Sequence, residues 1–391
     1  MPGFELIGEE ERQAVNEIFE DGGVLFAYGF DALRQRGRYR VQEFERAFAA
    51  RVKASHAQAV SSGTAALKTA LVAMGVRPGD EVITQAFTFV ATVEAIVDAG
   101  AIPVMVNVDE TLNMDPAELG RAITAKTKVI LPVHMLGVAA RIDAIMDIAN
   151  RHGLLVLEDN CQSIGASWNG RMLGTLGHAG AYSFDFGKAI TTGEGGMITT
   201  EDLEIYKLSR EYHDHGHEDN PAFPRGKDTR RIHGFTYRMS ELQAAVGLAQ
   251  LPKLDWLLAR NRENYAIIED MLVGINGLTF REIPSECEPL CDCLVFELPT
   301  RDLAEQFFSR MAAAGLGTKL LPDALDWHFG GTWDHIFKNF GMNREALWEH
   351  TLPTYDRLSR CIAIPVMVKH SAERCSEIGR QLRAIAEEVL G

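Results

Sequence analysis

The chain has 391 residues, 46% of them hydrophobic, and a formal net charge of −15 at pH 7. A chain of this length can bury a large core, usually in two domains, and its apolar content argues against disorder. The negative charge argues against nucleic-acid binding and favours a cytoplasmic protein. No apolar run reaches the roughly 20 residues that span a bilayer, and the start of the chain does not resemble a signal peptide.

Short predicted strands alternate with helices through the first half of the chain. We expect helices over 9–21 and 41–52, with an irregular segment at 24–40 between them. Strands then begin near residues 57, 80, 103, 129 and 154, and helices follow up to residue 74 and over 88–99, 115–123 and 142–152. Such alternation predicts a mostly parallel sheet wrapped by helices, with ligands beyond the carboxyl ends of the strands.

The first of these strands runs into the sequence Ser61-Ser62-Gly63-Thr64 and then into a helix rich in Ala and Leu. Hydroxyls and free backbone N–H groups at a helix N-terminus make a ready anion site. Serine and threonine at this place also serve simply as helix caps. The residues alone leave both readings open.

A carboxylate, Asp159, closes the strand 154–159. Burial at a strand end is costly for a carboxylate unless it meets a cation or several donors. A pyridinium nitrogen would be such a cation, and a protonated pyridine ring acts as an electron sink. The alternative is an aspartate that caps the next turn.

The stretch 181–200 contains a strand at 181–184, a tight loop with Lys188, and a second strand after Gly195-Gly196. Glycines at 193, 195 and 196 permit positive φ and the close approach of another group. A lysine held between two strands is placed for Schiff-base chemistry with an aldehyde cofactor. An isolated lysine is more often a solvated turn residue.

Two clusters of potential metal ligands occur in the second half, and we expect a metal at neither. The segment 206–233 is predicted to be polar and irregular and holds three histidines within 213–219, but no second ligand cluster accompanies them. Cys287, Cys291 and Cys293 are predicted to pack in or beside a strand, and the six scattered cysteines fit reduced thiols.

The remainder of the chain predicts a long linking helix over 254–271 and then a smaller α+β unit. Helical patterns occur at 307–314 and 370–389. Trp327-His328 and Trp333-Asp-His335 are predicted to lie in a loop, where they either contact a substrate or pack.

Together these features resemble the DegT/DnrJ/EryC1/StrS family of pyridoxal-phosphate-dependent sugar aminotransferases. The resemblance covers essentially the whole chain and is carried by 62–64, Phe87-Thr-Phe89-Val-Ala-Thr, Asp159 with Gln162, and Ser-Phe-x3-Lys-x4-Gly-Glu-Gly-Gly from Ser183. It implies an α/β fold of the fold type I aminotransferase class. A large cofactor-binding domain would span 1–252 and a smaller C-terminal domain 253–391.

The resemblance also implies roles for individual residues. Lys188 would carry pyridoxal 5′-phosphate and move a proton, and Asp159 would hold the pyridine nitrogen. Phe89 would stack on the ring, with Gln162 beside its hydroxyl. The phosphate would be held by Gly63, Thr64 and Ser183. In family members an asparagine reaches the phosphate of the partner subunit's cofactor, and the corresponding residue in this chain is Thr236. This correspondence implies a homodimer with shared active sites.

The lysine at 188 favours transamination, because similar dehydratases have histidine there. Within the family, 1–6, 214–217, 247–251 and 327–336 resemble transaminases that aminate 8-oxo-3-deoxy-manno-octulosonate for lipopolysaccharide sugars, with L-glutamate as donor. His215 and His328 are the predicted substrate-binding residues. Two alternatives are an aminotransferase for a nucleotide-linked 3- or 4-keto sugar and a cofactor-binding regulator without turnover. No Gly-x-Gly-x-x-Gly follows a predicted strand, which argues against a nicotinamide dehydrogenase.

Overall fold

The computed structural model describes residues 3–317, 319–321, 325–338, 341 and 343–391. Its centre is a seven-stranded sheet with the order β1-β9-β8-β5-β4-β2-β3. These strands are β1 (His56–Val60), β2 (Glu81–Gln85), β3 (Ile102–Val106), β4 (Thr127–Leu131), β5 (Leu155–Asp159), β8 (Ala179–Ser183) and β9 (Gly196–Thr200). Only β9 runs antiparallel to its neighbours in this sheet, so the prediction of a mostly parallel sheet is confirmed.

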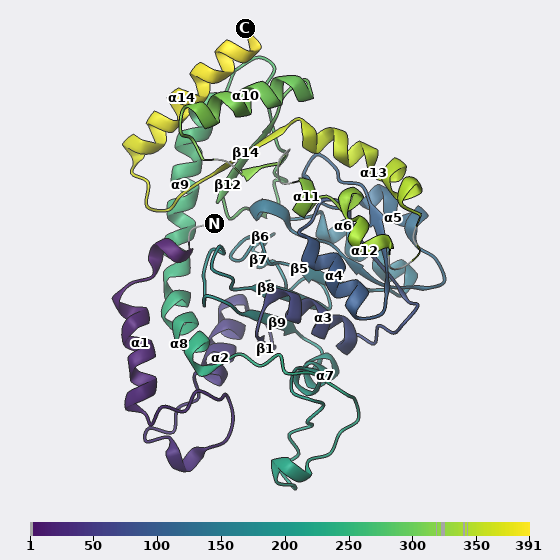
Figure 1. Ribbon diagram of the computed structural model, residues 1–391, viewed down its shortest axis with the longest axis vertical. Coiled ribbons are helices and arrows are strands. Elements are labelled where there is room, and N and C mark those ends of the chain that lie inside the picture. The colour runs from purple at the N-terminus through teal and green to yellow at the C-terminus, as the bar shows by residue number, and fades with distance from the viewer. Residues whose placement is uncertain (1–2, 318, 322–324, 339–340, 342) are drawn as a thin grey trace.

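Helices cover the two faces of this sheet (Figure 1). They are α1 (Glu9–Glu20), α2 (Arg40–Val52), α3 (Gly63–Ala73), α4 (Val90–Asp98), α5 (Pro116–Ala122), α6 (Ile142–His152), α7 (Leu203–His213) and α8 (Glu241–Gln250). Successive strand side chains point to opposite faces, and on β2 the buried Val82 and Ile83 accordingly belong to different apolar clusters. The seven-stranded sheet therefore separates two cores, one on each face, and a third core lies in the lobe of the second sheet.

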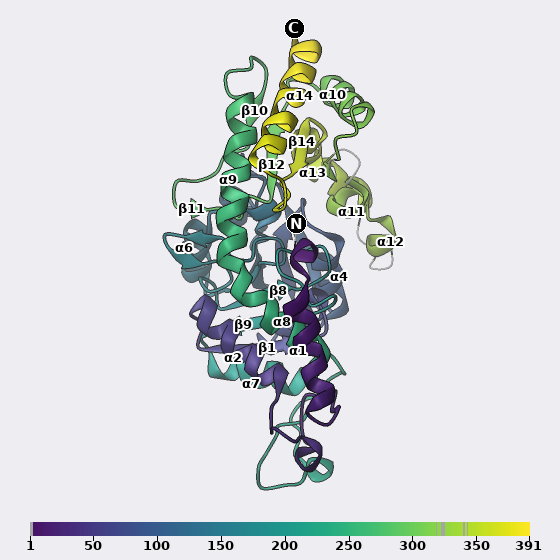
Figure 2. The ribbon, with the colours of Figure 1, turned by 90° about the vertical axis from the view of Figure 1, so that its left-hand side faces the viewer.

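A second, four-stranded antiparallel sheet lies in the upper lobe of Figures 1 and 2. It contains β10 (Thr279–Phe280), β12 (Cys293–Glu297), β13 (Lys319–Leu320) and β14 (Cys361–Pro365), with α10 (Arg301–Ala313), α13 (Arg344–Ser359) and α14 (Ala372–Leu390). Helix α9 (Leu254–Leu272) connects the lobes. A small third sheet comprises β6 (Ser167–Trp168), β7 (Arg171–Met172) and β11 (Cys287–Glu288). The predicted domain boundary at 252/253 falls in η5 (Leu251–Lys253), between α8 and α9, and stays a prediction.

Two segments predicted to be irregular are helical in part. In the first, 206–233, the residues up to His213 belong to α7, which is capped by the Asp202 side chain through hydrogen bonds from the N–H groups of Glu204 and Ile205. The second contains α11 (Leu325–His328) and α12 (Asp334–Phe337). Trp333 is 1% exposed there, and its indole N–H donates to the Asp326 carbonyl at 2.8 Å, so this tryptophan packs.

After α7 the chain leaves the sheet as an arm, defined here as residues 214–236. In Figures 1 and 2 the arm projects away from the body of the molecule below α7. None of the helices in the described ranges is long and apolar enough to cross a membrane.

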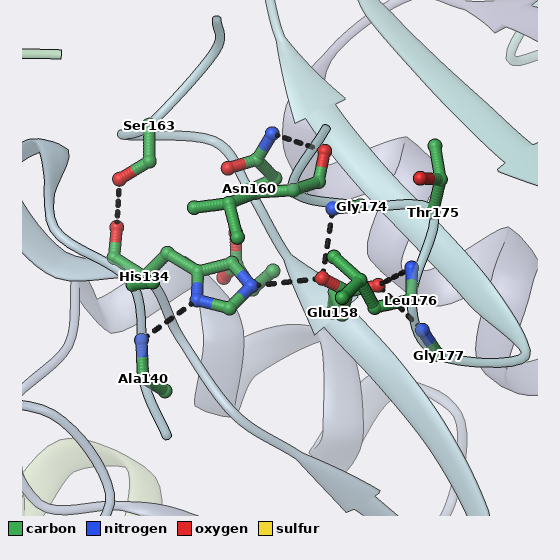
Figure 3. Close-up of polar contacts among 12 residues, drawn as sticks. His134, Ala140, Glu158, Asn160, Ser163, Gly174, Thr175, Leu176 and Gly177 are labelled. Carbon is green, nitrogen blue, oxygen red and sulfur yellow. Dashed lines mark hydrogen bonds and ion pairs between the residues drawn. The ribbon is translucent and has the colours of Figure 1, made fainter. Parts of the chain in front are cut away.

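A buried carboxylate, Glu158 on β5, ties this strand to the loop before β8 (Figure 3). It accepts hydrogen bonds from the backbone N–H groups of Gly174, Leu176 and Gly177 at 2.8, 2.6 and 2.6 Å. A buried charge is tolerated when several donors surround it. Glu158 therefore holds the turn between β7 and β8 in place.

His134 completes this network from the end of β4 (Figure 3). Its Nδ1 accepts a hydrogen bond from the Ala140 N–H at 3.0 Å, so Nε2 keeps the proton and donates to Glu158 at 3.0 Å. The His134 backbone N–H donates to the Asp159 carbonyl at 3.0 Å, and the Asp159 N–H to the Pro132 carbonyl at 2.9 Å. The network fixes the end of β5, where Asp159 leaves the sheet.

Replacement of Glu158 by glutamine tests this arrangement. The new amide would present N–H groups to backbone donors, so we expect the free energy of unfolding to fall by about 2–4 kcal/mol. Urea unfolding of the cofactor-free protein measures the loss, and amide exchange at 174–177 locates it. Glu9→Gln is the control, because Glu9 is exposed on α1 beside Arg12. Equal stability of the two variants would contradict a structural role for Glu158.

Candidate active site

A cavity of about 370 Å³ lies beyond the carboxyl ends of β5 and β8. Its wall includes eight of the ten residues predicted to form the site: Gly63, Thr64, Phe89, Asp159, Gln162, Ser183, Lys188 and His328. These residues come from five separate segments of the chain. Parallel strands and the helices that follow them bring such segments to one edge of a sheet.

Lys188 lies in a tight turn just after β8. The Lys188 N–H donates to the Asp185 carbonyl at 2.9 Å, and the Gly187 N–H donates to the Asp185 carboxylate at 3.0 Å. The Asp185 N–H in turn donates to the Ser183 hydroxyl at 3.3 Å. This turn holds the half-buried lysine at the wall of the cavity.

The three glycines after Lys188 serve two different purposes. Gly193 has a φ of +81°, the left-handed region that favours glycine. Gly195 and Gly196 do not, but a Cβ on Gly196 would collide with the Ser62 carbonyl, and one on Gly195 with the Thr192 hydroxyl. Gly196 thus lets β9 pack directly against the start of α3.

The start of α3 forms a polar cradle at one end of the cavity. Ser62 caps the helix, because its hydroxyl accepts the Ala65 N–H at 3.1 Å. The N–H groups at Gly63 and Thr64 lie in the first turn, where an α-helix has no acceptor for them. A Cβ at Gly63 would lie 2.7 Å from the Ser183 Cβ, so only glycine allows Ser183 this close. Ser62 can therefore cap the helix while the N–H groups at Gly63 and Thr64 remain free to bind an anion.

Asp159 is 3% exposed and accepts two hydrogen bonds from its own chain. The Thr92 hydroxyl donates to Oδ2 at 2.8 Å, and the Cys161 N–H donates to Oδ1 at 3.1 Å. The Thr88 hydroxyl lies 2.6 Å from that of Thr92 and donates to it, since the Thr92 proton is engaged. A carboxylate can accept about four hydrogen bonds, so Asp159 can accept another donor from the cavity.

Thr88 and Thr92 also line the cavity, and sequence reasoning missed them as site residues. Thr88 lies just before α4 and Thr92 lies in its first turn, at a spacing of four residues, and their hydroxyls are in contact. That spacing, next to the predicted Phe89, was the signal available in the sequence.

The remaining walls combine an amide, a thiol and aromatic rings. The Gln162 side-chain oxygen accepts the Leu136 N–H at 3.3 Å. Burial raises the pKa of the Cys161 thiol well above its usual range, which keeps it protonated. The Phe89 ring is 42% exposed, and its centroid lies 5.5 Å from that of His328. Phe89 thus offers a flat apolar wall beside an imidazole.

The other two predicted residues, His215 and Thr236, lie together on the arm and not in the wall of this cavity. The Thr236 hydroxyl lies 2.5 Å from the His215 ring nitrogen Nε2, and both residues are exposed. Asp214 and Thr236 form an antiparallel bridge, and the Asp214 carboxylate pairs with Arg225 at 2.5 Å. The arm therefore carries a defined pair of polar side chains.

The histidines of the 213–219 cluster point to different partners. His213 is buried, its Nε2 lies 2.9 Å from the Tyr28 hydroxyl, and burial lowers its pKa to about 4. His217 pairs with Asp228 at 3.3 Å. In the described part of the chain, no group of three or more His, Cys, Asp or Glu residues is arranged to hold a metal ion.

The cavity fits pyridoxal 5′-phosphate chemically. This cofactor needs an amine for its aldehyde, an acid for its pyridine nitrogen, donors for its phosphate and an apolar surface for its ring. Lys188, Asp159, the start of α3 and Phe89 meet these needs around one space.

Comparisons with known proteins agree with this chemistry. SpsC of Bacillus subtilis, a spore coat polysaccharide biosynthesis protein, is 41% identical over 290 residues, 73% of this chain and 70% of that protein. GDP-perosamine synthase of Caulobacter vibrioides is 46% identical over 230 residues, 58% of this chain and 60% of that protein. The crystal structure of 3-amino-5-hydroxybenzoic acid synthase superposes with a TM-score of 0.86 at 29% identity, covering 99% of this chain and 98% of that one.

A family model matches almost the entire chain, over residues 7–383, and is described as the DegT/DnrJ/EryC1/StrS aminotransferase family. The predicted fold class, a pyridoxal-phosphate-dependent sugar aminotransferase activity, and the cofactor are thereby confirmed. The chain therefore belongs to the DegT/DnrJ/EryC1/StrS aminotransferase family.

Proposed function

We propose that this enzyme transfers the amino group of L-glutamate to 8-oxo-3-deoxy-manno-octulosonate, in the synthesis of a lipopolysaccharide sugar. The observation that carries the reaction is the convergence of Lys188, Asp159 and the start of α3 on one cavity. The octulosonate is supported by the sequence resemblance at 214–217 and 327–336. His328, from the second of these segments, lines the cavity and supplies an imidazole for an acidic sugar.

Bound pyridoxal 5′-phosphate would supply an electron sink for the α-carbon of the amino donor. The Asp159 carboxylate would keep the pyridine nitrogen protonated, while Thr92 and the Cys161 N–H fix its orientation. The Lys188 amine, held by its turn, would accept the proton from the α-carbon of the donor and deliver it to C4′, the carbon of the cofactor's aldehyde group.

The other lining residues would bind the cofactor and orient its ring. The N–H groups of Gly63 and Thr64 and the Ser183 hydroxyl would hold the phosphate. Phe89 would cover one face of the ring, and Gln162 would contact the ring hydroxyl. Proximity of fixed groups of this kind is a large part of catalysis.

A nucleotide-linked keto sugar is the second candidate acceptor. It is supported by the 46% identity to GDP-perosamine synthase, whose name indicates a nucleotide-linked product. The third alternative, a cofactor-binding regulator without turnover, does not agree with the aminotransferase activity of the family, and Lys188 and Asp159 are both present at the cavity.

We also propose that the enzyme is a cytoplasmic homodimer with shared active sites. The pair of Thr236 and His215 supports this proposal, because it is exposed on the projecting arm and absent from the described wall of its own cavity. A partner subunit would bring the pair to the phosphate end of the cofactor.

Lys188→Ala tests the assignment of the lysine. We expect the purified variant to lack the visible absorbance band of the lysine-bound cofactor and to lose activity by about a thousandfold or more. Absorbance spectroscopy and a glutamate half-reaction measure the two effects. Lys207→Ala is the control, because this exposed lysine lies beside Glu204 on α7. An unchanged spectrum in the Lys188 variant would remove this lysine from its role.

Two half-reactions separate the candidate acceptors. Glutamate should convert the bound cofactor to its amine form, and 8-oxo-3-deoxy-manno-octulosonate should then restore the original spectrum. Restoration only by a nucleotide-linked 4-keto sugar would retain the aminotransferase and reject the octulosonate. A cofactor that does not respond to glutamate would reject the proposed amino donor.

Thr236→Val tests the shared site. We expect a dimer in sedimentation experiments and a severalfold faster loss of cofactor on dialysis, as follows from losing one hydrogen bond of about 1 kcal/mol. Thr229→Val on the same arm is the matched control, because Thr229 is exposed as well. A monomer that retains cofactor, or equal retention by both variants, would contradict the contact.

A further inference from the structure

We infer that the first described residues of the chain form a strap that positions the Lys188 loop and ties it to the opposite lobe. The strap is defined as Gly3–Leu6, the 3-10 helix η1. In Figures 1 and 2 this purple start of the chain lies where the two lobes meet. The inference rests on the proposed role of Lys188, which the strap would serve by positioning.

One end of the strap contacts the backbone of the lysine itself. The Gly3 N–H donates to the Lys188 carbonyl at 2.9 Å. Gly3 is buried, and a Cβ there would collide with the Lys188 carbonyl and lie 2.8 Å from that of Ala189. Its φ is not in the left-handed region, so glycine is required here for close approach rather than for backbone conformation.

Phe4 adds an aromatic contact on the outer side of the same loop. Its ring stacks on that of Phe186, with centroids 5.2 Å apart and planes at 18°. Such a stacked pair contributes about 0.5–1.5 kcal/mol beyond the area that it buries. Phe186 lies two residues before Lys188. The strap therefore contacts the turn twice, through the backbone hydrogen bond of Gly3 and through the ring of Phe4.

The other end of the strap is bound to residues far along the chain. The Glu5 carboxylate accepts the Val368 N–H at 3.0 Å and the Lys369 N–H at 3.4 Å, between β14 and α14. The Leu6 carbonyl accepts a hydrogen bond from Lys253 Nζ at 2.7 Å, in η5. Four consecutive residues thus connect the lysine loop with both the linking helices and the upper lobe.

These contacts predict a mechanical role. The Lys188 side chain can meet the cofactor only if its backbone stays fixed relative to Asp159 on β5. The turn around Asp185 fixes the loop from within, whereas the strap fixes it from outside. A movement of the upper lobe at 368–369 would be transmitted to the lysine through Glu5 and Gly3.

Hydrogen exchange on the cofactor-free, full-length protein tests the strap without reference to activity. We expect Gly3→Ala to speed amide exchange at 186–189 by about tenfold, the factor expected from losing one to two hydrogen bonds. Gly8→Ala is the matched control, because a Cβ there would meet only the end of the Glu10 side chain at 3.6 Å. Equal exchange at 186–189 in the two variants would overturn the inference.

Glu5→Ala tests the connection between the two ends. We expect faster exchange at 368–369 and also at 186–189, with Glu9→Ala on the exposed face of α1 as control. Faster exchange confined to 368–369 would show independent contacts and no strap.

Phe4→Leu replaces the first test if Gly3→Ala proves unstable. We expect a smaller increase in exchange at 186–189, with Phe223→Leu as the control for an exposed phenylalanine.

A second readout concerns the loaded enzyme. Gly3→Ala should retain the lysine-bound band but lose cofactor severalfold faster on dialysis than Gly8→Ala. If Lys188→Ala keeps the band, the proposed function fails while the exchange experiment still decides the strap. If Lys188→Ala loses the band and the exchange rates at 186–189 in Gly3→Ala do not change, only the strap is rejected.

Discussion

The structure depends on two adjacent carboxylates at the end of β5. Successive side chains of a strand point to opposite faces, so Glu158 and Asp159 meet different surroundings. Glu158 accepts four hydrogen bonds, three from backbone N–H groups and one from His134, and it fixes the turn before β8. Asp159 accepts two and lines the cavity. Because all hydrogen-bond acceptor positions of Glu158 are occupied, this carboxylate is structural. Asp159 still has acceptor positions for a ligand.

A close approach of backbones produces the rest of the site. At the start of α3, Gly63 lies against Ser183, and Gly196 lies against the Ser62 carbonyl. A single added Cβ at either glycine would push the helix away from β8 or β9. The helix N-terminus and the lysine turn can line one cavity only because both glycines allow this contact. The glycines near Lys188 therefore serve packing as much as turn formation.

Most of the fold and of the cavity wall could be predicted because the signals are local. Alternating apolar strands and helices indicated the parallel sheet, and strand-end residues such as Asp159 and Lys188 indicated the edge at which ligands bind. The helical end of α7 and the short helices after residue 325 were missed, because caps and tertiary packing decide them. The partners of Glu158 and the contact of Gly3 with Lys188 could not be predicted, since hydrogen bonds between distant segments leave no periodic trace in a sequence.

One wall of the cavity comes from the segment that the sequence left most ambiguous, which contributes His328. The Thr88 N–H donates to the His328 carbonyl at 2.9 Å, and the Gly330 N–H donates to the Ala86 carbonyl at 2.9 Å. An isolated antiparallel bridge joins Phe87 to Phe329. This bridge fastens 328–330 to the residues directly before α4, which carries Thr92 and begins just after Phe89. Changes in 328–330 would therefore reach both His328 in the cavity wall and, through α4, the Thr92 hydroxyl that supports Asp159. Under the roles proposed for His328 and Asp159, this contact would couple acceptor binding to cofactor orientation.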